Sequence, residues 1–454
     1  MAKYITYASH KATNITGLEN IPEHWEIKQV RYLLLDGQDG IKIGPFGSAL
    51  KLEDMVEAGY KVYGQENVIK KDFSLGKRWI SENKFNAMQV YRVHSGDILI
   101  TMMGTSGKCE IVPDDHQTGI IDSHLIRLGL QKDKMLPKFF KVLIDGTLEI
   151  EYQVKIQGKG SIMHGLNSSI IKSLELPIPP LSEQKDILNF LDFETAQIDT
   201  LIEKQQTLIQ LLKEKRQAVI SHAVTKGLNP DAPMKDSGVE WLGEVPEHWE
   251  VKGIKRLSEI KRGASPRPIA DQKYFDDEGE YAWTRIADVS RAGMYLDTTT
   301  QRLSDLGAAL SVKLEAGELF LSIAGTVGKP CITISKACIH DGFVYFPTLK
   351  INNKFLFYIF EAGQAYLGLG KMGTQLNLNT ETVGGIEIGL PPKKEIEAII
   401  KYIEDETARF DHLIDKAEQA IQLMQERRTA LISAAVTGKI DVRGWTAPDI
   451  EVGT

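Results

Sequence analysis

The sequence predicts an α/β fold combined with a coiled coil: two α/β domains at opposite ends of an antiparallel pair of long helices, related by a pseudo-two-fold internal repeat. Three observations lead to this fold class: an ordered set of internal sequence matches, two segments with heptad periodicity, and a linker rich in Gly, Pro and Asp between the copies. A chain of 454 residues is too long for one ordinary domain. Its composition, with 42% hydrophobic and 25% charged residues, is typical of folded globular proteins.

Four segments of the first half recur in the second half in the same order. The matching pairs are residues 21–32 (IPEHWEIKQVRY) with 245–256 (VPEHWEVKGIKR), 96–108 (GDILITMMGTSGK) with 317–329 (GELFLSIAGTVGK), 176–202 with 388–414, and 218–227 (AVISHAVTKG) with 430–439 (ALISAAVTGK). The offset is 224 residues at the first pair (21 to 245) and 212 at the last two (176 to 388). The copies therefore differ in length before their helical parts, and a period this long indicates duplicated domains rather than a solenoid.

The segments after the two Pro–Pro pairs predict long helices over residues 181–226 and 392–437. Apolar residues recur at positions a and d of a heptad through both segments, which is typical of a coiled coil. The side chains expected between the helices are Leu191, Ile198, Leu201 and Leu212 in the first and Ile403, Phe410, Leu413 and Met424 in the second.

The two helices are expected to pair with each other. Helices this long rarely find enough partner surface within one small domain, although packing of each helix on its own domain is the alternative. Ser182 is expected to cap the first helix, and Gly227 and Gly438 are expected to follow the two C-terminal ends.

The matches, the helices and the linker together divide the chain into seven segments. These are an N-terminal extension (1–20), a first α/β domain (21–180), a first long helix (181–226), a linker (227–244), a second α/β domain (245–391), a second long helix (392–437) and a C-terminal tail (438–454). Short apolar runs of strand length, such as DILIT (97–101) and ELFLSI (318–323), indicate the strands of the two domains.

Loops within each α/β domain carry the residues that we expect to contact nucleic acid. KIGPFGSALK (42–51) and KRGASPRP (261–268) combine basic and small residues; Arg can read guanine, while Lys or Ser can hold phosphate. The candidate contacts are Lys42, Ser48, Lys51, Lys261, Arg262, Ser265 and Arg267, together with Lys108 and Lys329 at the ends of GTSGK (104–108) and GTVGK (325–329). The alternatives are solvated charged loops for the first two segments and tight turns with one exposed lysine for the last two.

The sequence contains no pattern typical of a catalytic, metal or cofactor site. HExxH, GxSxG and paired cysteine spacings are absent, and Cys109, Cys331 and Cys338 are expected to be buried thiols in a reducing, cytoplasmic setting. No apolar run reaches the roughly 18 residues of a membrane helix, so no membrane span is expected. The net charge of −7 disfavours a simple basic nucleic-acid binder, and we interpret the chain as a binding protein.

Taken together, the motifs resemble the DNA-specificity subunit of Type I restriction–modification enzymes. The resemblance rests on PEHWE in both copies, GPFGSALK, the GDILI…GTSGK run, LPIPPLSEQ before the first helix, KDSGVEWLGEVPEHWEV at the junction of the copies and AAVTGKIDVRG near the C-terminus. These motifs cover nearly the whole chain in the order of the family. The second copy departs from the pattern before its helix, where it reads LPPKKEIE in place of IPPLSEQK.

The resemblance implies two target-recognition domains, each of which reads one half of a split site in double-stranded DNA, and helices that set the unread spacer. It also implies two modification subunits docked on the helices, which carry S-adenosylmethionine and methylate adenine. Restriction subunits would add ATP- and Mg-dependent translocation and cleavage, so that the chain itself binds no cofactor and is not catalytic. Two other classes stay open: a self-sufficient DNA-modifying enzyme with a cryptic site, and a structural decoy of the modification subunits of the kind a phage encodes.

Overall fold

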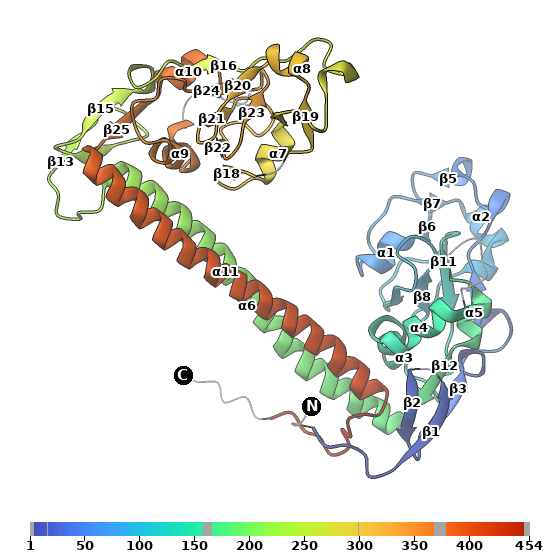
Figure 1. Cartoon of the computed structure of the whole chain (residues 1–454). Helices are drawn as coiled ribbons and strands as arrows, with labels where there is room; N and C mark the ends of the chain where they lie inside the picture. The colour runs from blue at the N-terminus through green and yellow to red at the C-terminus, as the bar shows by residue number, and fades with distance from the viewer. Residues whose placement is uncertain (1–3, 16, 158–165, 298, 367–377, 449–454) are drawn as a thin grey trace. The chain divides into compact units, whose positions relative to one another are not determined.

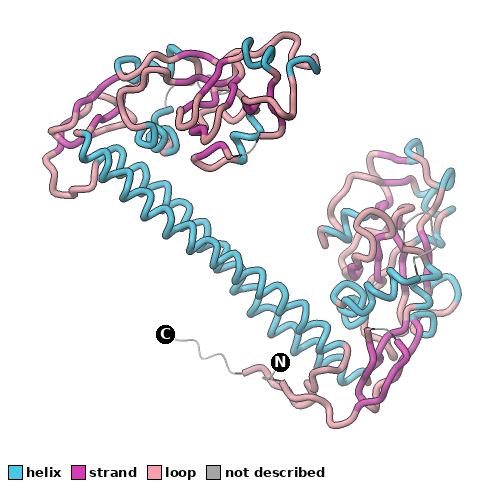
Figure 2. Tube along the Cα trace, viewed as in Figure 1, coloured by secondary structure: helices cyan, strands magenta, loops and turns pink. Residues whose placement is uncertain are grey.

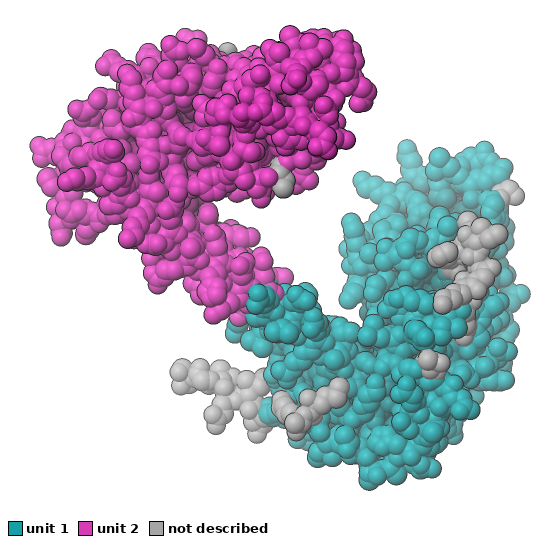
Figure 3. All heavy atoms as spheres, in the orientation of Figure 1, with its two compact units in different colours: residues 1–204, 419–454 teal, residues 205–418 magenta. Residues whose placement is uncertain are grey.

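The chain folds into two compact units, each with one α/β domain and one stretch of each long helix. The computed structural model describes residues 4–15, 17–157, 166–297, 299–366 and 378–448. One unit contains residues 1–204 and 419–454, and the other contains residues 205–418 (Figure 3). Each long helix contributes to both units, so this division differs from the predicted domain boundaries, which stay a prediction.

The two long helices are α6 (Leu181–Lys226) and α11 (Lys393–Val436), and they lie side by side (Figures 1 and 2). In the first unit, Arg428 of α11 forms an ion pair with Asp199 of α6 at 2.8 Å. In the second unit, Arg216 of α6 forms the equivalent ion pair with Asp411 of α11 at 3.0 Å. Both pairs join residues at matching positions of the repeat, so the antiparallel pairing of the helices is confirmed.

The residues between the helices agree with the prediction at position a of the heptad and differ from it at position d. Leu191, Ile198, Ile403 and Phe410 are buried, and Leu212 and Met424 are half-buried. The prediction was wrong for Leu201 and Leu413, which are 50% and 47% exposed.

The reason for this difference is that an isoleucine follows each of the two exposed leucines. Ile202 is half-buried and Ile414 is buried, so the isoleucine and not the leucine occupies the interface. Residues spaced by three and by four lie on the same face of a helix, so either member of a Leu–Ile doublet fits the heptad pattern.

The first long helix begins without the predicted side-chain cap, and a glycine follows the C-terminal end of each long helix. The first helix begins at Leu181, so Ser182 lies inside the first turn and is not the predicted cap; the Gln184 N–H bonds to the Pro180 carbonyl at 2.9 Å. Gly227 and Gly438 follow the C-terminal ends with φ of 75° and 77°, a conformation that favours glycine. A Cβ at Gly438 would lie 2.2 Å from Cδ of Pro22, so the close approach of the first domain also requires glycine there.

The first domain contains two sheets and a two-stranded ribbon. One sheet has the order β4 (Ile41–Ile43), β11 (Leu125–Leu128), β8 (Ile98–Thr101) and β9 (Cys109–Ile111), with antiparallel neighbours. The other has the order β10 (Gly119–Ile121), β6 (Tyr60–Tyr63), β7 (Trp79–Ile80) and β5 (Met55–Val56), with β10 and β6 parallel. The ribbon pairs β3 (Glu26–Gln29) with β12 (Glu175–Ile178), and the helices are α1 (Gln65–Ile69), α2 (Glu82–Ala87), α3 (Pro137–Gly146), α4 (Leu148–Gln157) and α5 (Ser168–Ser173).

The second domain shares the central strand pairings of this topology and differs from it at the sheet edges. One sheet has the order β16 (Lys261–Arg262), β24 (Phe343–Tyr345), β21 (Leu319–Ser322), β22 (Pro330–Thr333) and β18 (Tyr295–Leu296). The other has the order β19 (Gln301–Leu303), β17 (Tyr281–Thr284), β23 (Ala337–Ile339) and β20 (Val312–Leu314), with β17 and β23 parallel. The ribbon pairs β15 (Glu250–Gly253) with β25 (Glu387–Leu390), and the helices are α7 (Ile286–Arg291), α8 (Asp305–Ala309), α9 (Asn353–Glu361) and α10 (Thr380–Gly385).

The hydrophobic core of each domain continues onto the helix pair of its own unit. Strand β8 is buried at every residue, which explains why its sequence is a continuous apolar run rather than an alternating one. In the first unit, Ile100 of β8 and Phe140 of α3 belong to the same buried cluster as Leu191 of α6 and Leu431 of α11. A corresponding cluster in the second unit joins β21 and α9 to both helices.

The segments before and after these domains pack on the first unit or form a hairpin. Strands β1 (His10–Ile15) and β2 (Leu18–Pro22) pair near the N-terminus. Strand β13 (Met234–Asp236), in the predicted linker, pairs with β14 (Glu244–Pro246), which begins at the last residue of that linker. Trp445, in the predicted C-terminal tail, packs its ring edge-on against Phe190 of α6. Among the helices that the structure describes, none has both the length and the hydrophobicity of a membrane span.

A polar clamp joins each domain to the first turn of the helix that follows it. In the first unit, Nε1 of Trp25 donates to Glu183 at 3.0 Å, and Nε2 of His24 lies 2.8 Å from the other carboxylate oxygen. The Tyr7 hydroxyl also donates to Glu183. We call His24, Trp25 and Glu183 the first clamp.

The second clamp consists of His248, Trp249 and Glu395, and it has the same geometry. Trp249 donates to Glu395 at 3.0 Å, and His248 lies 2.8 Å from it. Both tryptophans are fully buried. The repeated PEHWE motif is therefore a structural joint, and the departure at LPPKKEIE is harmless because the glutamate that the clamp needs is present in both copies.

Removal of the clamp carboxylate should destabilise the chain, and more strongly in the first unit. Glu183 is only 4% exposed at its side chain and Glu395 is 28% exposed. Glu183→Ala therefore leaves the hydrogen-bond donors of the first clamp with less access to water than Glu395→Ala leaves those of the second. We expect Glu183→Ala to lower the free energy of unfolding by about 3 kcal/mol and Glu395→Ala by about 1–2 kcal/mol. Urea unfolding of the full chain measures both, with Glu214→Ala on the exposed side of α6 as the control; equal losses for Glu183→Ala and Glu214→Ala would contradict the clamp.

Candidate nucleic-acid interface

In each domain the segment with the predicted DNA contacts, residues 42–51 or 261–268, is called the first loop here. It is held against a short turn between two strands. The turn is residues 122–124 in the first domain, between β10 and β11, and residues 340–342 in the second, between β23 and β24. The Gly44 N–H bonds to the Leu125 carbonyl, and the Gly263 N–H bonds to the Phe343 carbonyl, each at 2.9 Å. A Cβ at Gly44 or Gly263 would lie 1.7 or 2.1 Å from a carbonyl oxygen of the turn, so only glycine allows this approach.

In the second domain the turn gathers three of the predicted residues around one residue, Asp341. Arg267 donates to the Asp341 carboxylate at 3.0 Å, and the Ser265 hydroxyl donates to its other oxygen at 3.3 Å. Arg262 donates to the backbone carbonyl of Asp341 at 2.5 Å. Arg267 is nevertheless 76% exposed at its side chain, so a guanidinium held in place by Asp341 is open to a base edge or a phosphate.

Sequence reasoning missed Asp341 and its neighbour His340. The Gly342 N–H lies 2.8 Å from Nδ1 of His340, so this nitrogen accepts a hydrogen bond and carries no proton. Burial lowers the pKa of His340 from its usual value, and the Asp341 charge opposes this shift. The neutral ring therefore supports the turn that presents Asp341.

The other predicted basic residues of the two first loops lie apart from such a cluster. Nζ of Lys42, on β4, lies 5.2 Å from the centroid of the Tyr91 ring. Lys51 forms an exposed ion pair with Glu53 at 2.9 Å, and Lys261 forms one with Glu259 at 2.9 Å. Ser48 belongs to a 3-10 turn, Gly47–Ala49, and its side chain lies outside the described residues.

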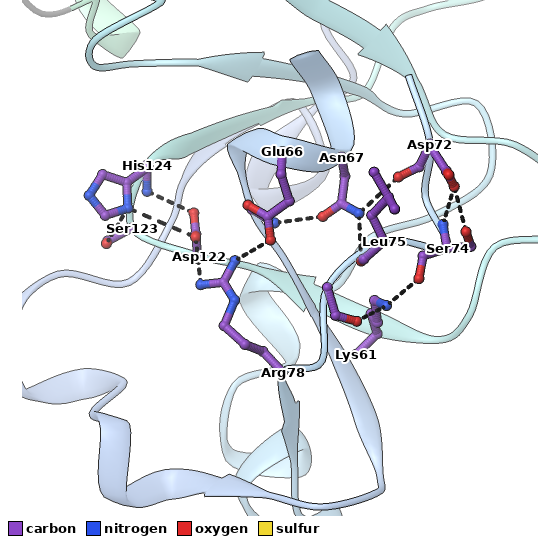
Figure 4. Close-up of polar contacts among 12 residues, drawn as sticks. Lys61, Glu66, Asn67, Asp72, Ser74, Leu75, Arg78, Asp122, Ser123 and His124 are labelled. Atoms are coloured by element: carbon purple, nitrogen blue, oxygen red, sulfur yellow. Dashed lines mark hydrogen bonds and ion pairs between the residues drawn. The ribbon is translucent and has the colours of Figure 1, made fainter. Parts of the chain in front are cut away.

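A polar cluster that the sequence did not predict surrounds the turn of the first domain. Asp122 accepts a hydrogen bond from Arg78 at 3.0 Å and one from the His124 N–H at 2.9 Å. Arg78 also donates to Glu66 at 3.3 Å, so two carboxylates hold one guanidinium (Figure 4). In the sequence, only the basic composition of the segment that ends at Arg78 could have indicated this cluster.

Lys108 and Lys329 occupy equivalent tight turns. The glycines of GTSGK have φ of 66° and 86°, and those of GTVGK have φ of 66° and 84°. Lys108 forms an ion pair with Asp145 of α3 at 2.6 Å, and Lys329 forms one with Glu361 of α9 at 3.6 Å. The glycines therefore set the shape of the turn, and a phosphate contact by either lysine stays a prediction.

The repeated domains with equivalent turns match one known family twice. The family model described as Type I restriction modification DNA specificity domain matches residues 50–213 and 246–423. The chain belongs to this family. Each matched segment of the DNA specificity domain covers most of one α/β domain and much of the long helix that follows it.

Similar proteins support the same assignment. The putative type I restriction enzyme MjaX specificity subunit of Methanocaldococcus jannaschii is 24% identical over 439 residues, which is 94% of this chain and 96% of that protein. The EcoBI specificity subunit of Escherichia coli is 22% identical over 381 residues, 80% of this chain and 78% of that protein.

Two solved structures share the fold. A chain from a structure titled for complex assembly and conformational transition of the type I R-M system superposes with a TM-score of 0.68, at 15% identity, covering 92% of this chain and 98% of that chain. The HsdS subunit from Thermoanaerobacter tengcongensis superposes with a TM-score of 0.54 at the same identity and coverages. At this identity the likeness concerns the fold of the DNA specificity domains alone.

The thiols of this family member lie in its interior. Burial raises the pKa of Cys331 and of Cys338 to about 12 and raises that of Cys109 further. Within the described residues, no group of three or more His, Cys, Asp or Glu side chains is placed to hold a metal ion.

Proposed function

We propose that the chain is the DNA sequence-specificity subunit of a Type I restriction–modification complex, and that each α/β domain reads one half of a bipartite site in double-stranded DNA. The observation that carries this proposal is that equivalent turns on a shared scaffold present different chemistry. In the second domain Asp341 holds two arginines, Arg267 through its carboxylate and Arg262 through its backbone carbonyl, whereas Asp122 and Glu66 share Arg78 in the first. Different side chains on one scaffold suit the reading of two different half-sites.

The chain supplies recognition, and its partners supply the reaction. We assign S-adenosylmethionine and adenine methylation to two modification subunits, and ATP, Mg and DNA cleavage to restriction subunits. The candidate cations are mostly paired with acids of the same domain, and the net charge is −7, so the partners would provide much of the phosphate neutralisation. The assembled complex would act on DNA in the cytoplasm.

The helix pair would set the length of the unread spacer and dock the modification subunits. Each helix runs without interruption through both compact units. Exposed leucines recur at equivalent positions of the repeat: Leu201 and Leu413, and Leu211 and Leu423 at 56% and 65% exposure. Each unit thus presents one member of each pair, which is the pattern expected if two copies of one partner bind.

Substitution of the arginines in the second domain should relax one half-site only. Arg267→Ala and Arg262→Ala each remove a guanidinium whose loss is expected to cost about 1–3 kcal/mol of discrimination. Single-molecule sequencing of methylated DNA from a host that carries the complete system gives the recognised site of each variant. We expect degeneracy confined to one half-site, with Lys336→Ala, an exposed lysine paired with Glu280, as the control. An unchanged site in both arginine variants, or loss of specificity in both halves, would contradict the assignment.

Replacement of the exposed leucines of one unit should remove one modification subunit. Leu201→Gln with Leu423→Gln removes apolar surface worth about 2–3 kcal/mol of binding, which is roughly a hundredfold in affinity. Native mass spectrometry of the assembled complex should then show one modification subunit in place of two. Leu208→Gln is the control, because Leu208 is exposed but its equivalent in the repeat is Ala420. Full occupancy in the double variant would rule out this docking surface.

A further inference from the structure

Residues 70–78 form a basic loop that the sequence analysis did not single out. The segment reads KKDFSLGKR, with four basic residues and one acidic residue. It connects α1 to β7 in the first domain. Lys70, Lys71 and Lys77 are exposed, so the loop carries a surface of positive charge on a chain that is acidic as a whole.

Two buried polar side chains hold this loop from inside the domain (Figure 4). The Asn67 amide donates to the carbonyls of Asp72 and Leu75 at 3.0 and 2.9 Å. Nζ of Lys61 donates to the carbonyls of Ser74 and Gly76 at 3.0 and 2.8 Å. Both side chains are almost completely buried. Buried polar groups need hydrogen-bond partners, and here the backbone carbonyls of the loop are those partners.

The backbone of the loop is fixed further by its own residues. Lys71 has φ of 55°, which a residue other than glycine rarely adopts and which persists only when the surroundings determine it. The Asp72 carboxylate accepts from both the N–H and the hydroxyl of Ser74, at 2.8 and 2.6 Å. The only acid of the loop is thus engaged in a turn of the loop itself.

The lysines of this loop differ from the cations that the sequence predicted. Within the described residues, Lys70, Lys71 and Lys77 form no ion pair, whereas Lys51, Lys108, Lys261, Arg267 and Lys329 are each paired with a carboxylate. An unpaired lysine on a rigid loop can bind a phosphate without first breaking an ion pair or ordering the chain. At its end, Arg78 links the loop to Asp122 and so to the turn of the candidate interface.

Among its described residues, the second domain has no comparable loop. Its residue equivalent to Asn67 is Asp288, which accepts from Arg291 at 3.0 Å and from the Arg285 N–H at 3.0 Å. The segment after α7, residues 292–300, contains no lysine or arginine, and Arg291 at the end of α7 is already paired with this buried acid. In the part of the chain that the structure describes, the basic loop belongs to the first domain only.

We propose that residues 70–78 are a preformed phosphate-binding loop that fixes the first domain on the backbone of its half-site, beside the turn that reads the bases. The proposal rests on the proposed function, because it assigns this loop to the same DNA. The ammonium group of a lysine, on its flexible side chain, suits contact with a phosphate. Such a contact positions the protein on DNA and carries no sequence information. The first domain would thus contribute backbone affinity that the second domain lacks.

The test compares the salt dependence of DNA binding by the assembled complex. In the double variant Lys70→Gln/Lys77→Gln, two phosphate contacts are lost, and Lys71 is left unchanged because of its positive φ. The slope of log affinity against log salt should become shallower by about two, for the methylated site and for unrelated duplex alike. The recognised sequence should stay the same. Lys28→Gln, at a lysine paired with Glu26 on β3, is the control and should leave the slope unchanged.

An unchanged slope in the double variant would overturn the proposal, and so would an altered recognition sequence, because the loop would then read bases. If the double variant does not assemble, Lys77→Gln alone should change the slope by about one. Failure of the proposed function is distinguishable, because the wild-type complex would then show no sequence-specific methylation at all. If the wild-type complex methylates a specific sequence but wild type and variant have equal salt slopes, only the phosphate-binding role of the loop is wrong.

Discussion

The rest of the structure depends on one interaction that recurs in both clamps: a carboxylate in the first turn of each long helix accepts the N–H of a buried tryptophan. Glu183 and Glu395 lie in the first turns of the two long helices, and the tryptophan and histidine that contact them lie in the turns just before β3 and β15. A buried carboxylate is tolerated only where donors satisfy it, so the contact specifies one arrangement of domain and helix. Each domain is thereby held on its own stretch of the helix pair.

A fixed scaffold leaves the loops free to differ. Both domains share four neighbouring strands in one sheet (β4-β11-β8-β9 and β16-β24-β21-β22), the same glycine-dependent contact between first loop and turn, and the same tight turns before β9 and β22. Their exposed chemistry differs: two arginines contact Asp341 in the second domain, and a basic loop exposes Lys70, Lys71 and Lys77 in the first. Duplication of the scaffold followed by divergence of loops is an economical way to read two unrelated half-sites.

The sequence predicted what is local or repeated, and missed what depends on distant contacts. The pair of long helices was predicted, because heptad periodicity is a local signal. The doublet Leu413–Ile414 fits two registers, so only packing shows that Ile414 faces the partner helix. PEHWE was visible as a repeat, but its glutamate partner lies 158 residues from Trp25. Arg267 was predicted from composition, whereas Asp341, 74 residues away, was not.

The claim that the helix pair sets the distance between the two half-sites is tested most directly by lengthening both helices and mapping the recognised site. One heptad is inserted between Lys204 and Gln205 in α6 and another between Glu418 and Gln419 in α11, where both helices pass from one unit to the other. Seven residues add about 10 Å at 1.5 Å per residue, or roughly three base pairs of DNA. Methylation mapping should then show the two half-sites unchanged and the spacer lengthened by about three base pairs; an unchanged spacer, with both half-sites still recognised, would contradict the account.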